Sequence, residues 1–600
     1  MKHNYIEAIE NYQWGFIELK VLSKNSKDID RNPTSGSMRL SSYKEYLLTL
    51  IQDKADTWLD YFKATKTKSH LTNALKTYAL ADSMIDFMRY EHAGEGSKLF
   101  WRQKTRGMYE RAIEACYLAG DMEQAFRFFE KSKAVLLADK LNELGANQQL
   151  PEVDNKRQKS LRDSITGLQN QLASLAINDK KRPMLQSRLE RFNDDFEEFR
   201  KNLEKTNPAY YRYKYDNSTP TITEFKKNLP ELSSAFVSYF VGDSAVYAFT
   251  IREQATLVRL TIKPNEYQTL ANEFLNLCAN RTTLNANYPR YRTLAHKLYQ
   301  YLWQPLGITE KRVIISSDGE FLPFEALLSA PTDDAFLLKQ HAVSYTYSAN
   351  FLVKGKPTNG FAQNLTSNSF VGFAPETFTA SLKQVALYGS KSALEAVANT
   401  FSLGKTFTYT EATKAAFLSY APNARVIQLF THADADPTEA IEPIIYFQDA
   451  ALRLSELNQT EGFNAQLLVL SACKTGVGQN QRGEGVFSLA RGFAALGIGS
   501  TVTTLWNVED QPTYELTKLF YTYLEEGLPK DEALQRAKLE WMQSGGKAEA
   551  LPSQWAGMIL VGDVNPLSGN RYPLIIGGIT AILLVSGGVW WRRKRKPVTL

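Results

Sequence analysis

The chain has 600 residues, of which 44% are hydrophobic and 22% charged, as is ordinary for globular proteins. This composition excludes a wholly disordered or collagen-like protein, and at about 150 residues per domain the length predicts roughly three to four units. The net charge is 70 − 64 = +6, and the five basic residues of Arg592–Lys596 supply +5 of it. The rest of the chain is nearly neutral, so its charge gives no indication of nucleic-acid binding.

Cysteine and histidine are scarce in this sequence. The three cysteines, Cys116, Cys278 and Cys473, are too few for a disulfide framework or a cysteine-rich zinc site. The six histidines are scattered along the chain, so we expect no metal site, and no organic cofactor is indicated. Neither residue type fixes the redox compartment.

Residues 1–150 are predicted to form a helical array. In Met108–Ala134 small alanines alternate with aromatic residues, and Gly120 and Asp121 separate two amphipathic helices. This pair resembles a tetratricopeptide repeat (TPR), in which small residues let neighbouring helices approach and aromatic residues fill the gaps. Such arrays are binding surfaces, so we expect a protein partner on the repeats. A plain helical bundle is the alternative.

Heptads follow over residues 151–207. Apolar residues advance in alternating steps of four and three, and Asn178–Pro183 separates two such runs with a turn that a helix does not readily cross. This period predicts an antiparallel coiled-coil hairpin. The two runs are Leu161, Ile165, Leu168, Leu172 and Leu175, and then Leu185, Leu189, Phe192, Phe196, Phe199 and Leu203.

Beyond Tyr215 the apolar pattern changes to that of strands. Near-continuous apolar strands alternate with helical segments, which predicts an α/β domain with a mainly parallel sheet over residues 220–566. The predicted strands are 235–241, 245–251, 256–262, 312–316, 342–347, 370–374, 425–430, 466–470 and 500–505.

The C-terminal segment has a different character. Pro573–Trp591 contains 19 residues without a charge, and a helix over them spans roughly 28 Å, close to the thickness of a hydrocarbon core. Tyr572, the two terminal tryptophans and the basic tail at 592–600 are typical of a membrane interface. We therefore predict a single-pass membrane protein with a transmembrane helix at 572–591. A buried core helix is the alternative.

The orientation of this segment stays open. The basic tail favours a cytoplasmic C-terminus, which puts residues 1–571 on the other side of the membrane. The opening Met1–Glu10 nevertheless lacks the apolar core of a secretory signal. Either the protein is tail-anchored against the charge rule, or the chain begins downstream of an exported N-terminus.

Two strand ends carry residue types suited to nucleophilic chemistry. Val426–Thr431 leads directly into His432, and Leu467–Ala472 leads directly into Cys473. Two neighbouring parallel strands would place both side chains at the same edge of a sheet. A thiolate attacks carbonyl carbon and a nearby imidazole transfers its protons, while the backbone N–H groups of Ala433 and Cys473 would form an oxyanion hole. Taken singly, each residue is equally at home as a structural core residue.

From about residue 236 to residue 563 the sequence resembles the CHAT family, the caspase-like domain associated with tetratricopeptide repeats, within the caspase clan of cysteine peptidases. The dyad-bearing core is about 310–563, and the anchored C-terminus is that of a bacterial type. The motifs that carry the resemblance are Ile314–Leu327, Leu429–Ala433, Leu468–Gly476, Gly483–Phe493, Thr504–Asp510 and Trp555–Asp563.

The resemblance implies a cysteine endopeptidase with a His432–Cys473 dyad and no cofactor or metal. Cys473 attacks the peptide carbonyl, and His432 protonates the leaving amine and later assists water. One position departs from the clan, because Ala433 stands where these enzymes commonly have glycine. A positive φ at Ala433 would be costly.

Glu484, Asp510 and Trp506 are candidates for the specificity pocket, with the acids facing a basic substrate residue as in some relatives of the clan. Each also has a structural alternative, as a helix cap, a solvated charge or a core side chain. Two hypotheses remain. The first is a membrane-anchored peptidase that acts on a protein or peptide and is regulated through the repeats, and the second is a non-catalytic scaffold with an unproductive dyad.

Overall fold

The computed structural model describes residues 4–567 apart from short internal stretches, and all that follows concerns the described residues. The stretches left out are 24–27, 92–94, 148–149, 177–178, 230–233, 333–334, 355–369, 437–440, 458–461, 473–474, 477–478, 482–484 and 545–549.

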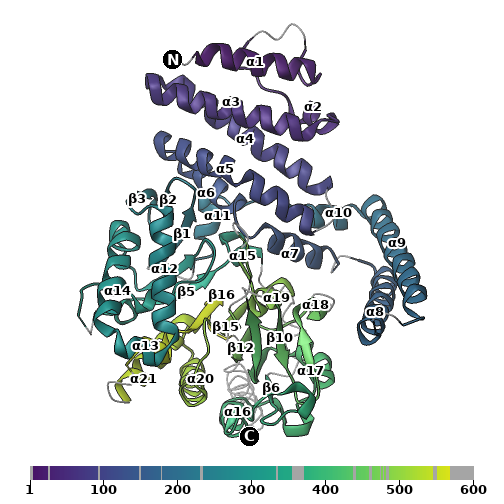
Figure 1. Cartoon of the computed structure of the whole chain (residues 1–600), viewed down its shortest axis with the longest axis vertical. Helices are drawn as coiled ribbons and strands as arrows, with labels where there is room; N and C mark the ends of the chain where they lie inside the picture. The colour runs from purple at the N-terminus through teal and green to yellow at the C-terminus, as the bar shows by residue number, and fades with distance from the viewer. Residues whose placement is uncertain are drawn as a thin grey trace, which may run out of the picture.

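The N-terminal part is an array of antiparallel helices that lies against one edge of the α/β part (Figure 1). Fully buried alanines, among them Ala74, Ala81, Ala112 and Ala115, let the successive helices approach. Asp121 caps the sixth helix by accepting a hydrogen bond from Gln124 N. The helices are α1 (Tyr5–Glu18), α2 (Ser35–Leu40), α3 (Lys44–Thr65), α4 (Lys68–Glu91), α5 (Glu95–Ala119), α6 (Met122–Lys131) and α7 (Val135–Asn147).

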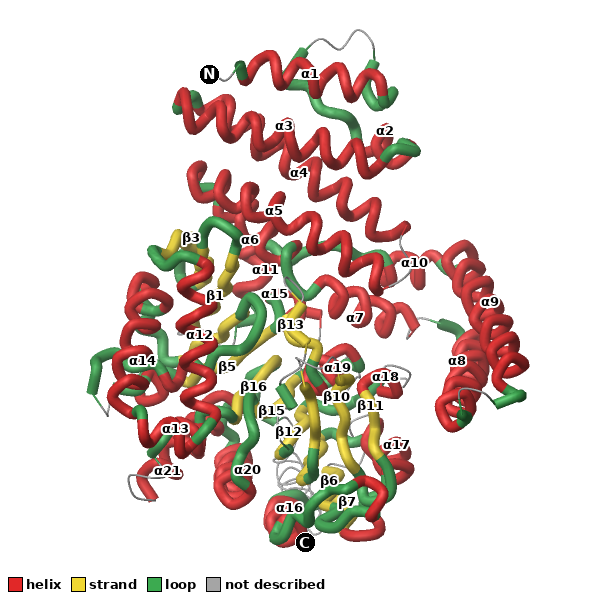
Figure 2. The backbone as a smooth tube through the Cα atoms, viewed as in Figure 1, coloured by secondary structure: helices red, strands yellow, loops and turns green. Residues whose placement is uncertain are grey.

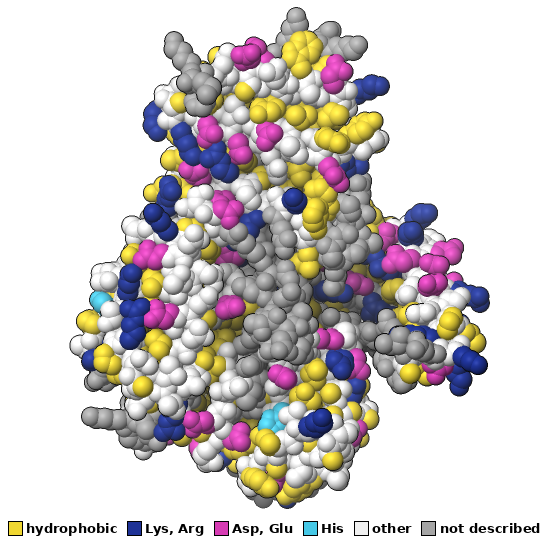
Figure 3. Space-filling model, viewed as in Figure 1, with side chains coloured by type: hydrophobic (Ala, Val, Ile, Leu, Met, Phe, Trp, Pro, Cys, Tyr) yellow, Lys and Arg dark blue, Asp and Glu magenta, His cyan; other side chains and the backbone are white. Residues whose placement is uncertain are grey.

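A helical hairpin projects from the side of the molecule in Figure 1. Its helices, α8 (Glu152–Ser174) and α9 (Arg182–Thr206), pack against each other through Leu168, Leu172 and Leu185. Both signs of charge are spread over its outer surface in Figure 3, as expected for a solvated face. The short helices α10 (Pro208–Lys214) and α11 (Ile222–Lys226) lead from the hairpin to the sheet.

The α/β part is built on one 11-stranded mixed sheet with helices on its faces (Figure 2). The strand order is β3-β2-β1-β4-β5-β16-β15-β12-β8-β6-β7, and neighbouring strands are parallel except in the pairs β1–β2, β2–β3 and β15–β16. Most of these strands are buried along their whole length because helices cover both faces. Their bounds are β1 (Ser234–Val241), β2 (Val246–Ile251), β3 (Ala255–Leu260), β4 (Arg312–Ser316), β5 (Ala342–Thr346), β6 (Phe370–Ala374), β7 (Gly404–Thr408), β8 (Val426–Phe430), β12 (Leu467–Ser471), β15 (Ser500–Thr504) and β16 (Met558–Gly562).

The sheet has two halves that run in opposite directions. In the first half, β1, β4 and β5 are parallel, and β16 continues their direction. In the second half, β15, β12, β8, β6 and β7 are parallel to one another and antiparallel to β16. The carboxyl ends of the two sets of strands therefore point in opposite directions along the strands of the sheet.

The remaining elements are helices of the α/β part and two small sheets. The helices are α12 (Pro264–Ala279), α13 (Arg281–Ala286), α14 (Tyr288–Leu302), α15 (Ala349–Lys354), α16 (Ser390–Ala398), α17 (Lys414–Tyr420), α18 (Leu454–Leu457), α19 (Leu489–Ala495), α20 (Asp510–Glu525), α21 (Lys530–Ser544) and α22 (Pro552–Trp555). The small sheets consist of β9 (Ala433–Asp436), β10 (Ile441–Tyr446) and β11 (Ala451–Arg453), and of β13 (Gln479–Gln481) and β14 (Gly485–Phe487).

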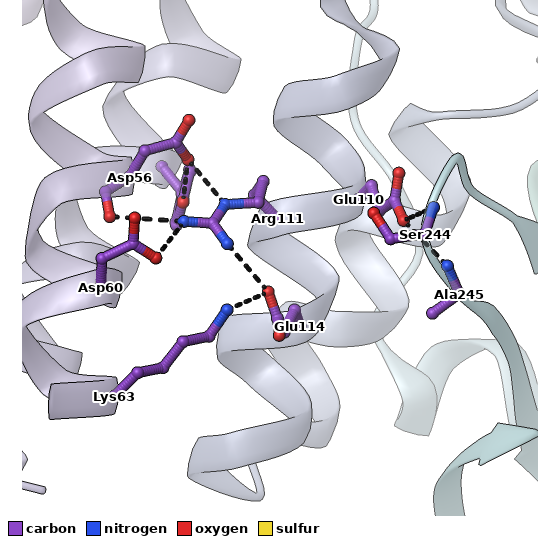
Figure 4. Close-up of polar contacts among 9 residues, drawn as sticks. Asp56, Asp60, Lys63, Glu110, Arg111, Glu114, Ser244 and Ala245 are labelled. Atoms are coloured by element: carbon purple, nitrogen blue, oxygen red, sulfur yellow. Dashed lines mark hydrogen bonds and ion pairs between the residues drawn. The ribbon is translucent and has the colours of Figure 1, made fainter.

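Helix α5 links the outer helices of the array to the first half of the sheet (Figure 4). The Glu110 carboxylate accepts hydrogen bonds from three backbone N–H groups of the β1–β2 turn, at 2.7 Å from Asp243, 2.8 Å from Ser244 and 3.2 Å from Ala245. On the next residue, the Arg111 guanidinium pairs with Asp60 of α3 at 2.6 Å. Adjacent residues of one helix thus contact the sheet on one side and the outer array on the other.

The turn between α6 and α7 lies over the carboxyl ends of β1 and β4. The Lys133 ammonium donates to Ser238 Oγ at 2.9 Å and to the Ser316 carbonyl at 3.0 Å. The Arg106 guanidinium donates to Asp318, just beyond β4, and burial lowers the pKa of Lys133 to about 8. The Glu130 carboxylate accepts from the backbone N–H of Asn350 at 2.8 Å, and its burial raises its pKa.

The predicted fold class is wrong in one component, the transmembrane helix. Among the described residues, no helix is long and apolar enough to cross a membrane. The long helices, such as α5, carry charged residues along their length, whereas a membrane span tolerates few. The predicted segment 572–591 and the tail 592–600 lie outside the described residues. We therefore correct the fold class to a helical part plus a mixed α/β part, and the single-pass membrane localisation is withdrawn with it.

Candidate active site

The edge formed by the carboxyl ends of β8 and β12 holds the candidate site. These strands are parallel neighbours in register, from Val426 beside Leu467 to Phe430 beside Ser471. His432 comes two residues after Phe430, and Cys473 comes two residues after Ser471. Cys473 itself lies outside the described residues. The described strands thus place the residues that precede both predicted dyad residues side by side. They lie at the carboxyl ends of parallel strands, where α/β proteins place their sites.

The His432 ring is held by the segment between β6 and α16. Its Nε2 lies 2.8 Å from the Val385 carbonyl oxygen, and the Phe378 ring packs against it at 5.2 Å between centroids. A carbonyl oxygen can only accept, so Nε2 carries the proton in this contact. In the neutral imidazole Nδ1 is then unprotonated, which is the state that a general base requires.

The segment that provides these contacts is itself anchored. Thr379 N donates to the Gln448 carbonyl at 2.9 Å, and Leu387 N donates to the Glu376 carbonyl at 2.8 Å. Sequence reasoning did not find Val385 or Phe378. A backbone carbonyl leaves no signature in the residue type, and Val385 and His432 are 47 residues apart.

Ala433 does not have the positive φ that would be costly for alanine. It begins β9, where it faces Ile445 of β10 in an antiparallel pair, and it is not among the residues with positive φ. The extended backbone carries no strain from the Cβ of alanine. Alanine in place of the expected glycine is therefore compatible with this site.

The candidate specificity residues fall in different places. Asp510 is the exposed first residue of α20, where desolvation raises the pKa of its carboxyl and the nearby His432 opposes that rise. Trp506 is buried, its indole Nε1 donates to the Ser553 carbonyl at 3.2 Å, and its ring fills the space beside Gly557. Glu484 lies outside the described residues. The structure thus brings Asp510 near His432 and places Trp506 in the core.

The two described cysteines are unsuited to nucleophilic chemistry. Cys116 and Cys278 are free and buried, and burial raises the pKa of each thiol above its ordinary value. Nor do the described residues contain a group of three or more His, Cys, Asp or Glu side chains that could hold a metal ion.

Residues 292–563 match the family model described as the CHAT domain. This match confirms the CHAT resemblance over that stretch, and the mixed α/β architecture agrees with the caspase-like fold that the resemblance implies. The match supports neither a bacterial origin nor an anchored subtype. No curated protein matches the chain in sequence.

Several solved structures resemble the chain at a distance. The Arg-specific cysteine proteinase gingipain R has 9% identity and a TM-score of 0.33 over 50% of this chain and 76% of its own. A complex of Porphyromonas gingivalis RgpB pro- and mature domains gives the same identity and TM-score. The Saccharomyces cerevisiae separase–securin complex has 10% identity and a TM-score of 0.36 over 92% of this chain and 51% of its own. Likenesses this distant carry no conclusion about this chain.

Proposed function

We propose that the protein is a cysteine endopeptidase in which Cys473 is the nucleophile and His432 is its proton-transfer partner. The observation that carries the proposal is the pairing of β8 with β12, because it brings the residues just before His432 and Cys473 into register. The CHAT match over 292–563 supports the same chemistry.

The contacts of His432 define its part in the reaction. With Nε2–H committed to Val385 O, Nδ1 takes the thiol proton. The thiolate sulfur then attacks the peptide carbonyl carbon, and the C–N bond breaks as His432 returns the proton to the leaving amine. Water, deprotonated by His432, hydrolyses the thioester and restores the thiol.

The proposed oxyanion hole combines the backbone N–H groups of Ala433 and Cys473. The His432 carbonyl accepts from Tyr446 N at 2.9 Å, so Ala433 and Ile445 form the next, non-hydrogen-bonded pair of this antiparallel ladder. We infer that Ala433 N–H points away from β10 and is available to a ligand. Two such donors stabilise the negative oxygen that develops during attack.

Asp510 supports a preference for substrates with lysine or arginine before the cleaved bond. Asp510 is exposed and its carboxylate interacts electrostatically with His432, so it lies where a substrate cation would be attracted. The substrate is a protein or peptide, and the helical array α1–α7 offers a separate surface for a protein partner.

The test is labelling of the full chain with an acyloxymethyl-ketone peptide library. We expect labelling to disappear in Cys473→Ala and in His432→Ala, and to persist in Cys278→Ala, which removes a buried thiol. Undiminished labelling of Cys473→Ala would refute the proposed nucleophile. If neither labelling nor cleavage of a peptide library occurs with the wild-type chain, the non-catalytic scaffold becomes the better account.

A further inference from the structure

Thr504 contacts the chain on both sides of the candidate nucleophile. It is the last residue of β15, next to β12, and it is fully buried. Its hydroxyl donates to the Ala472 carbonyl at 2.6 Å, and its backbone N–H donates to Thr475 Oγ1 at 3.1 Å. Its carbonyl accepts from Gly476 N at 2.9 Å. One residue therefore uses all three of its polar groups on the chain that enters and leaves positions 473 and 474.

The direction of these hydrogen bonds is unambiguous. The Ala472 carbonyl can only accept, so the single hydroxyl proton of Thr504 is used there. Thr475 Oγ1 lies 2.8 Å from Thr503 Oγ1, which gives the Thr475 hydroxyl a second neighbour on β15. At Gly476 a Cβ would lie 3.1 Å from the Thr504 carbonyl, so this close backbone approach favours glycine.

The Ala472 carbonyl belongs to the same peptide unit as the N–H of residue 473. A trans peptide is planar, with the N–H directed opposite to the C=O, so a bond that fixes the carbonyl also fixes the N–H. A hydrogen bond to the carbonyl further polarises the unit and makes its N–H a stronger donor.

We propose that Thr504 is a positioning residue that orients and polarises the peptide unit between Ala472 and Cys473, and thereby one donor of the oxyanion hole. This inference rests on the proposed function, in which the N–H of Cys473 binds the oxyanion. Thr504 itself does not touch the substrate.

Thr517 offers a matched control. It is as fully buried as Thr504, and its hydroxyl lies 3.1 Å from Ser471 Oγ, two residues before Cys473. Its contact is with a side chain, whereas that of Thr504 is with the backbone carbonyl. Thr504→Val and Thr517→Val exchange a buried hydroxyl for a methyl group with little change of volume, and Thr504→Ser restores the hydroxyl.

The first measurement is amide hydrogen exchange of the full chain, which reports the anchoring whatever the chemistry. We expect Thr504→Val to speed exchange at Thr475 and Gly476 by at least about tenfold, corresponding to about 1.4 kcal/mol. Thr517→Val and Thr504→Ser should leave this exchange close to that of the wild type. Unchanged exchange in Thr504→Val would overturn the inference even if the protein proves to be a peptidase.

The second measurement compares two reagents at Cys473. A tripeptide aldehyde with arginine at its reactive end forms a hemithioacetal whose oxygen occupies the oxyanion hole, whereas iodoacetamide alkylates the thiolate without one. We expect Thr504→Val to weaken aldehyde binding by about tenfold to a hundredfold and to leave the rate and pH profile of alkylation unchanged. Equal losses with both reagents would mean a merely structural role and would overturn the inference.

The proposed function has its own criterion in the same experiment. Aldehyde binding that survives Cys473→Ala unchanged contradicts the nucleophile assignment. Aldehyde binding that is lost in Cys473→Ala but normal in Thr504→Val contradicts only the role of Thr504.

Discussion

The two halves of the sheet present their carboxyl ends to different surroundings. At those of β1 and β4 in the first half, Lys133 and Arg106 of the helical array are buried against Ser238, Ser316 and Asp318. At the carboxyl end of β8 in the second half, His432 is partly exposed, and its ring contacts Val385 and Phe378 of the segment between β6 and α16.

The opposite directions of the two halves account for this difference. The array lies over one end of the strands of the sheet. At that end the strands of the first half have their carboxyl ends, and the strands of the second half have their amino ends. In agreement, Leu144 of α7 packs beside Gly462 and Gly497, which precede β12 and β15. The carboxyl ends of the second half are therefore on the far edge, clear of the array. The direction of the strands therefore determines in which half the carboxyl ends, where α/β proteins place their sites, are not covered by the array.

The largest expected effect is a loss of stability in the first half of the sheet, where the helical array covers the carboxyl ends of β1 and β4. Asp318→Asn leaves the buried Arg106 guanidinium without its carboxylate, so we expect a loss of about 3–5 kcal/mol in the free energy of unfolding. Urea denaturation measures this loss. Peptidase activity per folded molecule should be unchanged. A variant as stable as the wild type would show that the array is not held at this edge by the Arg106–Asp318 pair.

A second test uses pH on the same half. Burial lowers the pKa of Lys133 from its ordinary 10.5 to about 8, in spite of the neighbouring Asp318 and Glu130. Between these values the folded chain has released the proton that the unfolded chain retains, so stability rises with pH there. The wild type should gain up to about 3 kcal/mol relative to Lys133→Met between pH 8 and 10.5. Denaturation at several pH values measures the difference, and parallel curves would contradict it. Lys54, whose pKa is also lowered to about 8, titrates equally in both proteins.

In the second half of the sheet, which holds the candidate active site, we expect a substitution to change peptidase activity. Asp510→Asn removes the carboxylate proposed to attract the substrate cation, so we expect kcat/KM for peptides with arginine before the cleaved bond to fall about a hundredfold, or about 2–3 kcal/mol. Matched peptides with leucine at that position should be affected far less. The unfolding free energy should change little because Asp510 is exposed to solvent. Equal losses on both peptides would remove Asp510 from the specificity pocket.

Much of the secondary structure followed from hydrophobic periodicity. The predicted strand at 312–316 coincides with β4, and the heptad leucines Leu168, Leu172 and Leu185 do pack together. The opposing directions of the two halves could not be predicted. A strand buried on both faces has the same apolar pattern whichever way it runs.

The site shows the same limit. Both residues at strand ends were predicted as the dyad, because a reactive type after a buried strand is a local signal, and this assignment stays a prediction. The contacts of His432 and of Ala472, the residue before Cys473, are not local. Val385 acts through a carbonyl that every residue has, and Thr504 meets Ala472 only because β15 pairs with β12. Side-chain identity predicts chemistry, whereas backbone contacts require the fold.

The smallest effect separates two carboxylates one turn apart on α5 (Figure 4). Glu110 is buried and binds three N–H groups of the β1–β2 turn, so Glu110→Gln should cost about 1–2 kcal/mol in unfolding free energy. Glu114 pairs with the partly exposed Lys63 and Arg111, so Glu114→Gln should cost less than about 1 kcal/mol and should lose that effect in high salt. Urea denaturation at low and high salt distinguishes the two. Equal costs would mean that the Glu110 hydrogen bonds from α5 to the β1–β2 turn stabilise the protein no more than the surface ion pairs within the array. The array would then be held against the first half of the sheet by contacts other than those of Glu110.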